Sequence, residues 1–137
     1  LKLSRGLGDV YKRQGENGFI PEAFIPQAEV RLEIYKKFSA IKDLENLKTY
    51  IKELEDRFGS LPEDLQILIN QTSIRIEANN LLINKIKGDG IKCTLALNEN
   101  SNLVSKNSKI KEISFNYPKE INSKSEFVLN KLKSFSV

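Results

Sequence analysis

Few side chains in this chain of 137 residues could do chemistry, because the usual catalytic and metal-binding types are nearly absent. There is no histidine, and Cys93 is the single cysteine, so no Cys-x-x-Cys pair exists. The sequence also contains no Walker-type phosphate loop and no Gly-x-Ser-x-Gly nucleophile motif. We therefore expect no catalytic site and no metal site here, and no enzyme activity of the chain by itself.

Carboxylates are the remaining groups with suggestive spacing. Glu53 and Asp56 lie three residues apart, which on a helix places both on one face as a compact acidic patch. From the residues alone this is most simply a solvated face, with Asp56 paired to Lys52 or Arg57. The carboxylates of Glu63-Asp64 fit the start of a helix, where negative charge is favourable.

The net charge of +4 is unevenly distributed. Residues 15–80 hold eight basic and twelve acidic side chains, whereas residues 81–137 hold ten lysines and five acids. Binding to a nucleic-acid backbone needs several basic groups on one surface, so the first of these parts has the wrong sign for it. The second leaves a small basic nucleic-acid-binding module as an alternative function.

The composition bounds the class of protein. With 39% hydrophobic and 29% charged residues, we expect one soluble domain, and no apolar run approaches the ~20 residues of a membrane span. A single cysteine and the lack of a secretory signal fit a reducing cytoplasm. The absence of methionine indicates an internal or C-terminal piece of a longer reading frame.

The chain divides into three parts. Residues 1–14 lack periodicity and are interpreted as a non-native or linker segment. Residues 15–25 are expected to be an extended linker, with a hinge at Gly15-Glu16-Asn17-Gly18. Residues 26–137 are expected to form one α+β domain: three N-terminal helices followed by a small antiparallel sheet and a closing C-terminal helix.

Apolar spacing and capping residues predict the three helices. The first covers 26–39, with Pro26 in its first turn. The second runs from a cap at Asp43 to residue 58, where Gly59 supplies a positive φ. The third begins at a Ser60–Glu63 capping box and continues to 82. The apolar side of the first helix consists of Val30, Leu32, Ile34, Tyr35, Phe38 and Ile41.

Beyond residue 83 the period changes from helix to strand. Alternation over 91–97 predicts a half-buried strand with Cys93 in the core, paired with 85–87 through a tight turn in which Asp-Gly supplies positive φ. Residues 98–108 are expected to be a loop. A further strand is predicted at 113–117, and a last helix at 127–135.

Three motifs together carry a family resemblance: Ile20-Pro21-Glu22-Ala23-Phe24-Ile25-Pro26, Arg31-Leu32-Glu33-Ile34-Tyr35-Lys36-Lys37 and Asp56-Arg57-Phe58-Gly59-Ser60-Leu61-Pro62. Their order and spacing resemble the C-terminal domain of bacterial transcription-repair coupling factors, the Mfd family. The resemblance is strong from Gly18 to Ile86 and patchy afterwards. The motif residues that we carry over are Ile20, Pro21, Pro26, Arg31, Leu32, Tyr35, Phe58, Gly59 and Pro62.

The resemblance implies a function. Such parent proteins are ATP-driven DNA translocases, with ATP and Mg in an upstream motor, that act on stalled RNA polymerase and recruit UvrA. Their C-terminal domain has no activity of its own and serves as an autoinhibitory clamp, docked on a UvrB-like module so that the UvrA-binding surface is hidden. In this chain Glu53, Asp56 and Arg57 would form the docking surface.

Three points remain open at this stage. Family members usually have a further helix and strand where this chain has only the polar stretch 98–108, so the strand number is uncertain. From the residues alone, Arg31 and Arg57 are expected to brace the helices through Glu29 or Glu33, with Tyr35 half-buried. The alternative is a recognition surface formed by Arg31, Tyr35, Lys36 and Arg57. Besides the nucleic-acid module, a structural dimerisation domain built on the second helix is a further possibility.

Overall fold

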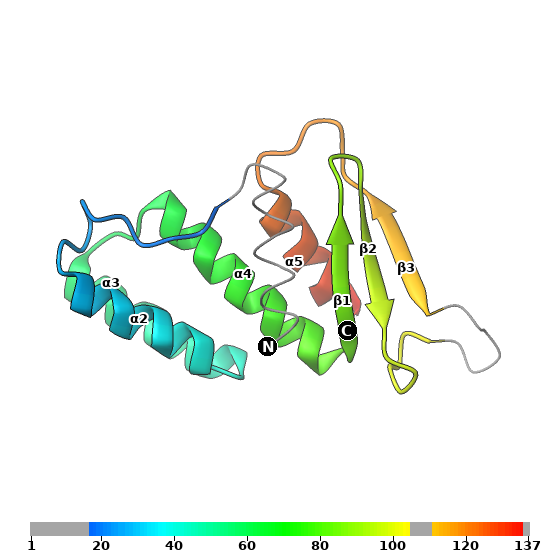
Figure 1. Ribbon diagram of the computed structural model, residues 1–137, viewed down its shortest axis with the longest axis horizontal. Helices are drawn as coiled ribbons and strands as arrows, with labels where there is room; N and C mark the ends of the chain where they lie inside the picture. The colour runs from blue at the N-terminus through cyan, green and yellow to red at the C-terminus, as the bar shows by residue number, and fades with distance from the viewer. Residues whose placement is uncertain (1–16, 105–110, 136–137) are drawn as a thin grey trace.

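The computed structural model describes residues 17–104 and 111–135 (Figure 1). The elements in these ranges are α2 (Ala28–Ala40), α3 (Leu44–Phe58), α4 (Glu63–Asn80), β1 (Ile83–Gly88), β2 (Lys92–Leu97), β3 (Glu112–Asn116) and α5 (Lys124–Phe135). The predicted α+β class is confirmed, with three helices, a three-stranded antiparallel sheet and a C-terminal helix. The interpretation of residues 1–14 concerns a segment outside the described ranges.

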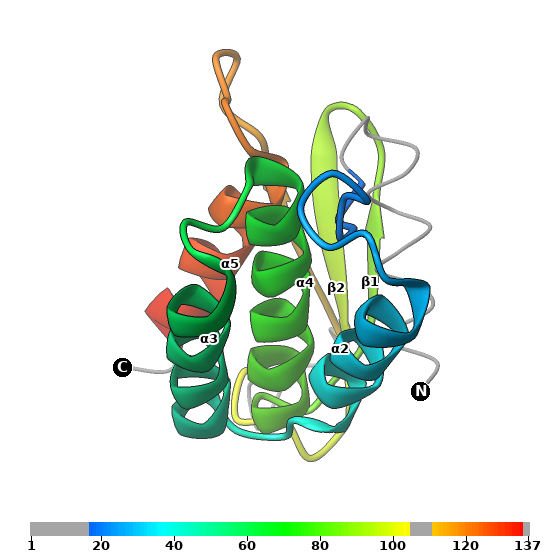
Figure 2. The ribbon, with the colours of Figure 1, turned by 90° about the vertical axis from the view of Figure 1, so that its left-hand side faces the viewer.

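Helix α4 is the centre of the molecule. Figure 2 shows it flanked by α2 and α3, while Figure 1 shows α5 and the sheet on its other side. Two apolar clusters result: Leu65 and Ile69 of α4 pack with α2 and α3, and Ile74 and Ala78 pack with the sheet and α5. Helix α4 therefore contributes buried residues to both clusters and joins the helical half to the sheet half.

The predicted second helix is confirmed at both ends. The Asp43 carboxylate accepts a hydrogen bond from the Asn46 amide at 2.8 Å, as an N-cap does. Gly59 ends α3 with φ 88° and ψ −159°, a region that only glycine enters without strain. The first helix begins later than expected, at Ala28, so Pro26 precedes its N-cap and does not lie in its first turn.

The capping box predicted for the third helix is wrong. Pro62 occupies the N-cap and makes no side-chain cap, so the Ser60 hydroxyl lies too early in the chain to act. The carbonyl of Pro62 instead accepts from the amides of Leu65 and Gln66. The helix also ends at Asn80 and not at Leu82, because Leu82 turns the chain with φ 56°.

The sheet has the order β1-β2-β3, and both pairings are antiparallel. The predicted hairpin is confirmed, but its turn differs: Gly90 has no positive φ, and the Asp89 carboxylate instead accepts from the amides of Ile91 and Lys92. Ile91 therefore lies outside the strand, 73% exposed, where alternation had predicted a buried residue. Residues 98–104 form no helix or strand, and residues 105–110 lie outside the described ranges.

Cys93 is confirmed as a core residue, with no exposed surface. Burial raises the pKa of its thiol from 9.0 to about 11, although a hydrogen bond with Tyr117 acts in the opposite direction. The thiolate is the reactive form of cysteine, so this thiol is inert in the folded protein.

Raising the pH from 9 to 11 is expected to destabilise the fold through Cys93. The unfolded thiol loses its proton from pH 9 upward, whereas the folded thiol keeps it until about 11, so deprotonation favours unfolding across this window. Urea unfolding at several pH values would show a steeper loss of stability in the wild type than in Cys93→Ala. Parallel curves for the two proteins would contradict it.

Candidate functional site

The acidic patch, defined as Glu53 and Asp56, lies on the outer face of α3. Both residues are exposed, while Leu47 and Leu54 on the opposite face are each only 2% exposed. Within the described residues, no ion pair joins Asp56 to Lys52 or Arg57, so the local pairing considered from sequence does not form. In the part of the chain that the structure describes, the patch is therefore a pair of carboxylates without an ion-pair partner on a well-anchored helix.

Among residues 17–104 and 111–135, Arg57 forms no ion pair with a carboxylate either. Its guanidinium carbon lies 4.8 Å from the centre of the Phe58 ring, and that ring lies 5.9 Å from the ring of Phe24. This cation–π contact places an exposed arginine one turn from Glu53. Arg57 thus belongs to the same surface as the patch, at the end of α3.

A groove of about 550 Å³ borders the patch, between α3 and the end of α2. Its lining includes Lys37, Tyr50 and Glu53. The ammonium of Lys37 lies 5.7 Å from the centre of the Tyr50 ring. Burial raises the pKa of the Tyr50 phenol, the charges of Glu53 and Glu33 raise it further, and Arg57 opposes them. The charge of Glu53 is therefore felt at the Tyr50 phenol in this groove.

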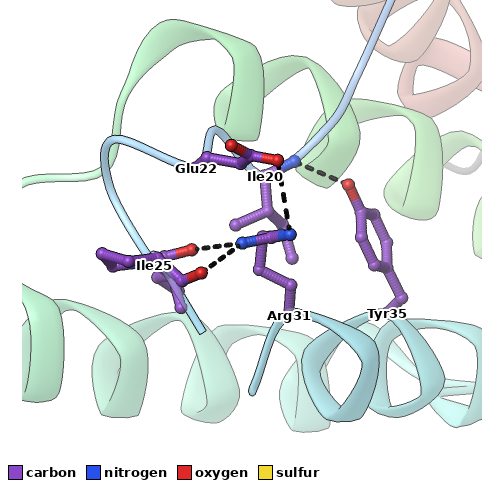
Figure 3. A network of polar contacts seen from close by, with 6 residues as sticks. Ile20, Glu22, Ile25, Arg31 and Tyr35 are labelled. Atoms are coloured by element: carbon purple, nitrogen blue, oxygen red, sulfur yellow. Dashed lines mark hydrogen bonds and ion pairs between the residues drawn. The ribbon is translucent and has the colours of Figure 1, made fainter. Parts of the chain in front are cut away.

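The leading segment, residues 17–27, is fastened to α2 by a polar network (Figure 3). The Arg31 guanidinium donates to the carbonyl of Ile25 at 2.8 Å and to that of Pro26 at 2.9 Å, and it forms a 3.7 Å ion pair with Glu22. The Ile20 amide donates to the Tyr35 hydroxyl at 2.8 Å. The motif at 20–26 is therefore bonded directly to the motif at 31–37.

Arg31 thus braces the structure, as expected, but through Glu22 and two carbonyls and not through Glu29 or Glu33. Tyr35 is half-buried, as expected. Leu32 was assigned to the apolar side of its helix and is instead 54% exposed. Ile34 is buried in the core of the helical half, whereas Leu32 points away from that core. Leu32 therefore has no packing role within the described structure.

The leading segment is not a free hinge from Gly18 onward. A Cβ on Gly18 would lie 2.5 Å from the Leu68 amide nitrogen, so the backbone of this residue touches α4 directly. The Phe19 amide also donates to the Asp64 carbonyl at 3.2 Å. A turn from Pro21 to Ile25 interrupts the extended path that was expected. Ile20 and Ile25 are 3% and 1% exposed, and both belong to the core of the helical half.

Sequence reasoning missed Arg75, which fixes the other end of α2. Its guanidinium donates to the carbonyls of Phe38 and Ile41, both at 2.8 Å. Burial lowers the pKa of this arginine. A cation on the last carbonyls of a helix complements the helix dipole. The only sequence indication of this role was an isolated arginine among the apolar residues of α4, and its positive charge alone had been considered.

Replacing Arg31 with alanine is expected to lower the free energy of unfolding by about 1–3 kcal/mol, because two carbonyls and a carboxylate lose a charged donor. Urea denaturation would measure the loss. Lys36→Ala, at an exposed position of the same helix, should change stability by less than about 0.5 kcal/mol. Equal effects of the two changes would contradict the bracing role.

Two kinds of site are absent from the described part of the chain. In residues 17–104 and 111–135, no group of three or more histidine, cysteine, aspartate or glutamate side chains could hold a metal ion. Over the same ranges, no helix is both long and apolar enough to cross a bilayer. The candidate site is the acidic patch with its surroundings, because exposed carboxylates on a fixed helix are suited to electrostatic contact with a basic surface.

Comparison with protein families identifies relatives of this chain. The TRCF domain model matches residues 15–108. The transcription-repair-coupling factor of Escherichia coli K12 is 36% identical over 96 residues, which is 65% of this chain and 8% of that protein. That of Bacillus subtilis 168 is 24% identical over 105 residues, 77% of this chain and 9% of the relative. The chain thus spans less than a tenth of these relatives.

A solved structure has the same fold. The crystal structure of the C-terminal domain of transcription-repair coupling factor aligns with a TM-score of 0.67, covering 88% of this chain and 91% of that one. The sequence identity of that alignment is 18%, so the likeness concerns the fold alone.

Proposed function

The chain belongs to the TRCF domain family, the C-terminal domain of transcription-repair coupling factors, and we propose that it acts there as an autoinhibitory docking domain. In this proposal the acidic patch of α3 binds a basic surface on the UvrB-like module of the same parent protein. The docked domain hides the surface that UvrA would bind. Release of the domain exposes that surface.

One observation carries the proposal: Glu53 and Asp56 are exposed on a fixed helix and, within the described residues, have no cationic partner. Arginines of another module could complete such a surface with bidentate, charge-assisted hydrogen bonds. Because Leu47 and Leu54 anchor the opposite face of α3, the two carboxylates are held in place before docking, and little side-chain and backbone order has to be gained.

In this proposal the leading segment transmits movements of the upstream module to the docking domain. It is the part of the described chain through which an upstream module would connect, and it is bound to both α2 and α4. The ring of Phe24 in this segment also lies 5.9 Å from the ring of Phe58 at the end of α3, the helix that carries the patch. A displacement of the upstream chain would therefore act on the packed helices and not on a slack linker. This coupling supports a clamp that opens when the parent changes conformation.

The energies required are modest. A ligand or conformational change needs a differential free energy of about 1–3 kcal/mol to shift such a two-state equilibrium by 5–150-fold. Surface carboxylates paired with arginines across an interface supply interactions of that order. Docking of this kind is therefore strong enough to mask a surface and weak enough to be reversed.

Calorimetric titration of this chain with a separately produced UvrB-like module of a related coupling factor tests the proposal. We expect saturable binding that weakens as salt is raised, because exposed charges are screened over about 10 Å at 0.1 M salt. Absence of binding by folded protein at high concentration would refute docking. Binding that is insensitive to salt would show that the acidic patch is not the contact.

The parent protein sets the wider context of this proposal. It would be a DNA translocase that uses ATP and Mg in an upstream motor, with RNA polymerase, UvrA and DNA as partners that this chain meets only through the parent. The location would be the cytoplasm. The chain itself would contribute regulation and no catalysis.

A second candidate function rests on the outer face of the sheet. By the register of the strands, Lys85 and Lys87 of β1 lie on the same face as Lys92 of β2, and all three are exposed. Such a face could contact phosphates of a nucleic acid. It predicts DNA binding by the isolated chain that falls steeply with salt, in proportion to the phosphates neutralised, and that Lys85→Ala with Lys87→Ala abolishes.

A further inference from the structure

The two edges of the sheet are protected to different degrees. Edge β1 carries Lys85 and Lys87, and its register with β2 shifts between Ile83 and Lys85. Lysines and bulges are devices that block further strand pairing. Edge β3 runs in unbroken register with β2 and contains no lysine, no proline and no bulge between Glu112 and Asn116. Within the described residues, no strand pairs with its outer side.

The hydrogen bonds to β2 show which backbone groups of β3 face outward. The Leu97 amide donates to the Lys111 carbonyl, and the Tyr117 amide donates to the Ile91 carbonyl. Because the direction alternates along an antiparallel strand, the odd-numbered residues of β3 face β2. The amides and carbonyls of Glu112, Ser114 and Asn116 therefore point to the open edge, which is the outermost strand in Figure 1.

The side chains of β3 match a second copy of the same strand. We propose that two copies of this chain associate through β3, antiparallel and two-fold symmetric about Ser114, so that a six-stranded sheet forms. In this register Ser114 faces Ser114 of the other copy, and Glu112 faces Asn116. These are the residues with outward backbone groups, so each pair exchanges backbone hydrogen bonds.

The intervening positions also fit. Ile113 faces Phe115 of the other copy, an aromatic and β-branched pair at the closer, non-hydrogen-bonded spacing. Both side chains are only half-buried against the core of the sheet, so pairing would cover their remaining exposed surface. Lys111 faces Tyr117, which allows a cation–π contact at each end. No like charges oppose one another in this register.

Basic residues of α5 oppose the association. The ammonium of Lys131 lies 5.7 Å from the centre of the Phe115 ring, and that of Lys124 lies 5.2 Å from the centre of the Tyr117 ring. Two copies would bring these like charges closer together. We therefore expect association that strengthens with salt, opposite to the salt dependence of nucleic-acid binding or of docking through the acidic patch.

Sedimentation equilibrium of the full chain over a wide concentration range tests the proposal. We expect a weak monomer–dimer equilibrium, since one short strand per copy buries a small interface. Ser114→Pro removes an outward amide without touching the ladder to β2, so it should raise the dissociation constant about tenfold or more. Ser114→Ala is the matched control, because it loses the same 2.9 Å side-chain contact with Thr94 and keeps the amide.

A charge exchange at the symmetry axis gives a second test that depends on the register. Ser114→Lys and Ser114→Glu each place like charges opposite one another and should both be monomeric, whereas an equimolar mixture should form the heterodimer. Thermal unfolding would confirm that each variant is folded. A chain that is monomeric at every concentration, a dimer that Ser114→Pro leaves intact, or a mixture that stays monomeric would each overturn the proposal.

Discussion

Reversing both charges of the acidic patch, as Glu53→Arg with Asp56→Arg, is expected to weaken docking on the UvrB-like module by at least about 100-fold. Each carboxylate would be replaced by a group that repels the arginines of the partner surface, and close charge pairs across interfaces couple with about 1.5–7 kcal/mol. The fold should persist, since both residues are exposed and neither makes an ion pair within the described residues. Calorimetry against the module measures the loss.

The control separates the patch from net charge. Glu99→Arg with Glu120→Arg changes the charge by the same amount at two exposed positions outside α3. We expect this variant to bind within about threefold of the wild type, because exposed charges beyond a screening length of about 10 Å act weakly. Equal losses in the two variants would mean that docking follows total charge and not the patch.

Gly18→Ala is expected to lower the free energy of unfolding by about 1–3 kcal/mol and to loosen the leading segment. The added Cβ would lie 2.5 Å from the Leu68 amide nitrogen and 2.7 Å from the Leu68 Cα, and the backbone of a helix cannot give way easily. The segment would have to lift, which exposes Ile20 and breaks its bond with Tyr35. Urea unfolding measures the loss, and limited proteolysis detects the loosening.

Gly90→Ala is the matched control for this change. The same Cβ at Gly90 would meet no atom within 4 Å, and the backbone there has no positive φ. Its stability should stay within about 0.5 kcal/mol of the wild type. Equal free energies of unfolding for Gly18→Ala and Gly90→Ala would contradict the close packing of Gly18 against α4.

Local rules predicted the elements wherever one strong signal acted alone. Helix α3 was predicted to the residue, because Asp43 and Gly59 mark its ends and its apolar residues recur at a single helical period. Strands β2 and β3 were found from their alternation, whereas β1 was predicted from the turn that follows it. Cys93 followed from that pattern, since every second residue of β2 faces the core.

Some failures had local causes and others had tertiary ones. The predicted Ser60–Glu63 capping box does not form, because Pro62 occupies the N-cap position of α4. Ile91 lost its place in the strand because the Asp89 carboxylate closes the turn over its amide. Leu32 satisfied a loose apolar pattern but faces solvent, and the two-sided burial of α4 has no signal in a single amphipathic period.

The placement of Glu53 and Asp56 on an exposed helix face was predictable from the sequence, whereas the contacts that support that helix were not. Spacing alone placed Glu53 and Asp56 on one face, and the resemblance to the coupling factors implied a docking surface there. The bonds of Arg31 and Arg75 to backbone carbonyls could not be foreseen, because they join segments that only the tertiary fold brings together. In the sequence, Arg31 was identified as a motif residue and Arg75 only as a positive charge. The structure shows that Arg31 binds the leading segment and that Arg75 binds the end of α2.

The most direct test of autoinhibition is UvrA binding by a complete parent coupling factor that carries this domain. Affinity for UvrA would be measured for the wild type and for the variant with the Glu53→Arg and Asp56→Arg changes. In the proposed clamp, loss of docking would expose the hidden surface, so we expect tighter UvrA binding by the variant, by about 5–150-fold. Unchanged UvrA affinity, in a variant shown to have lost docking, would contradict the claim that this domain masks that surface.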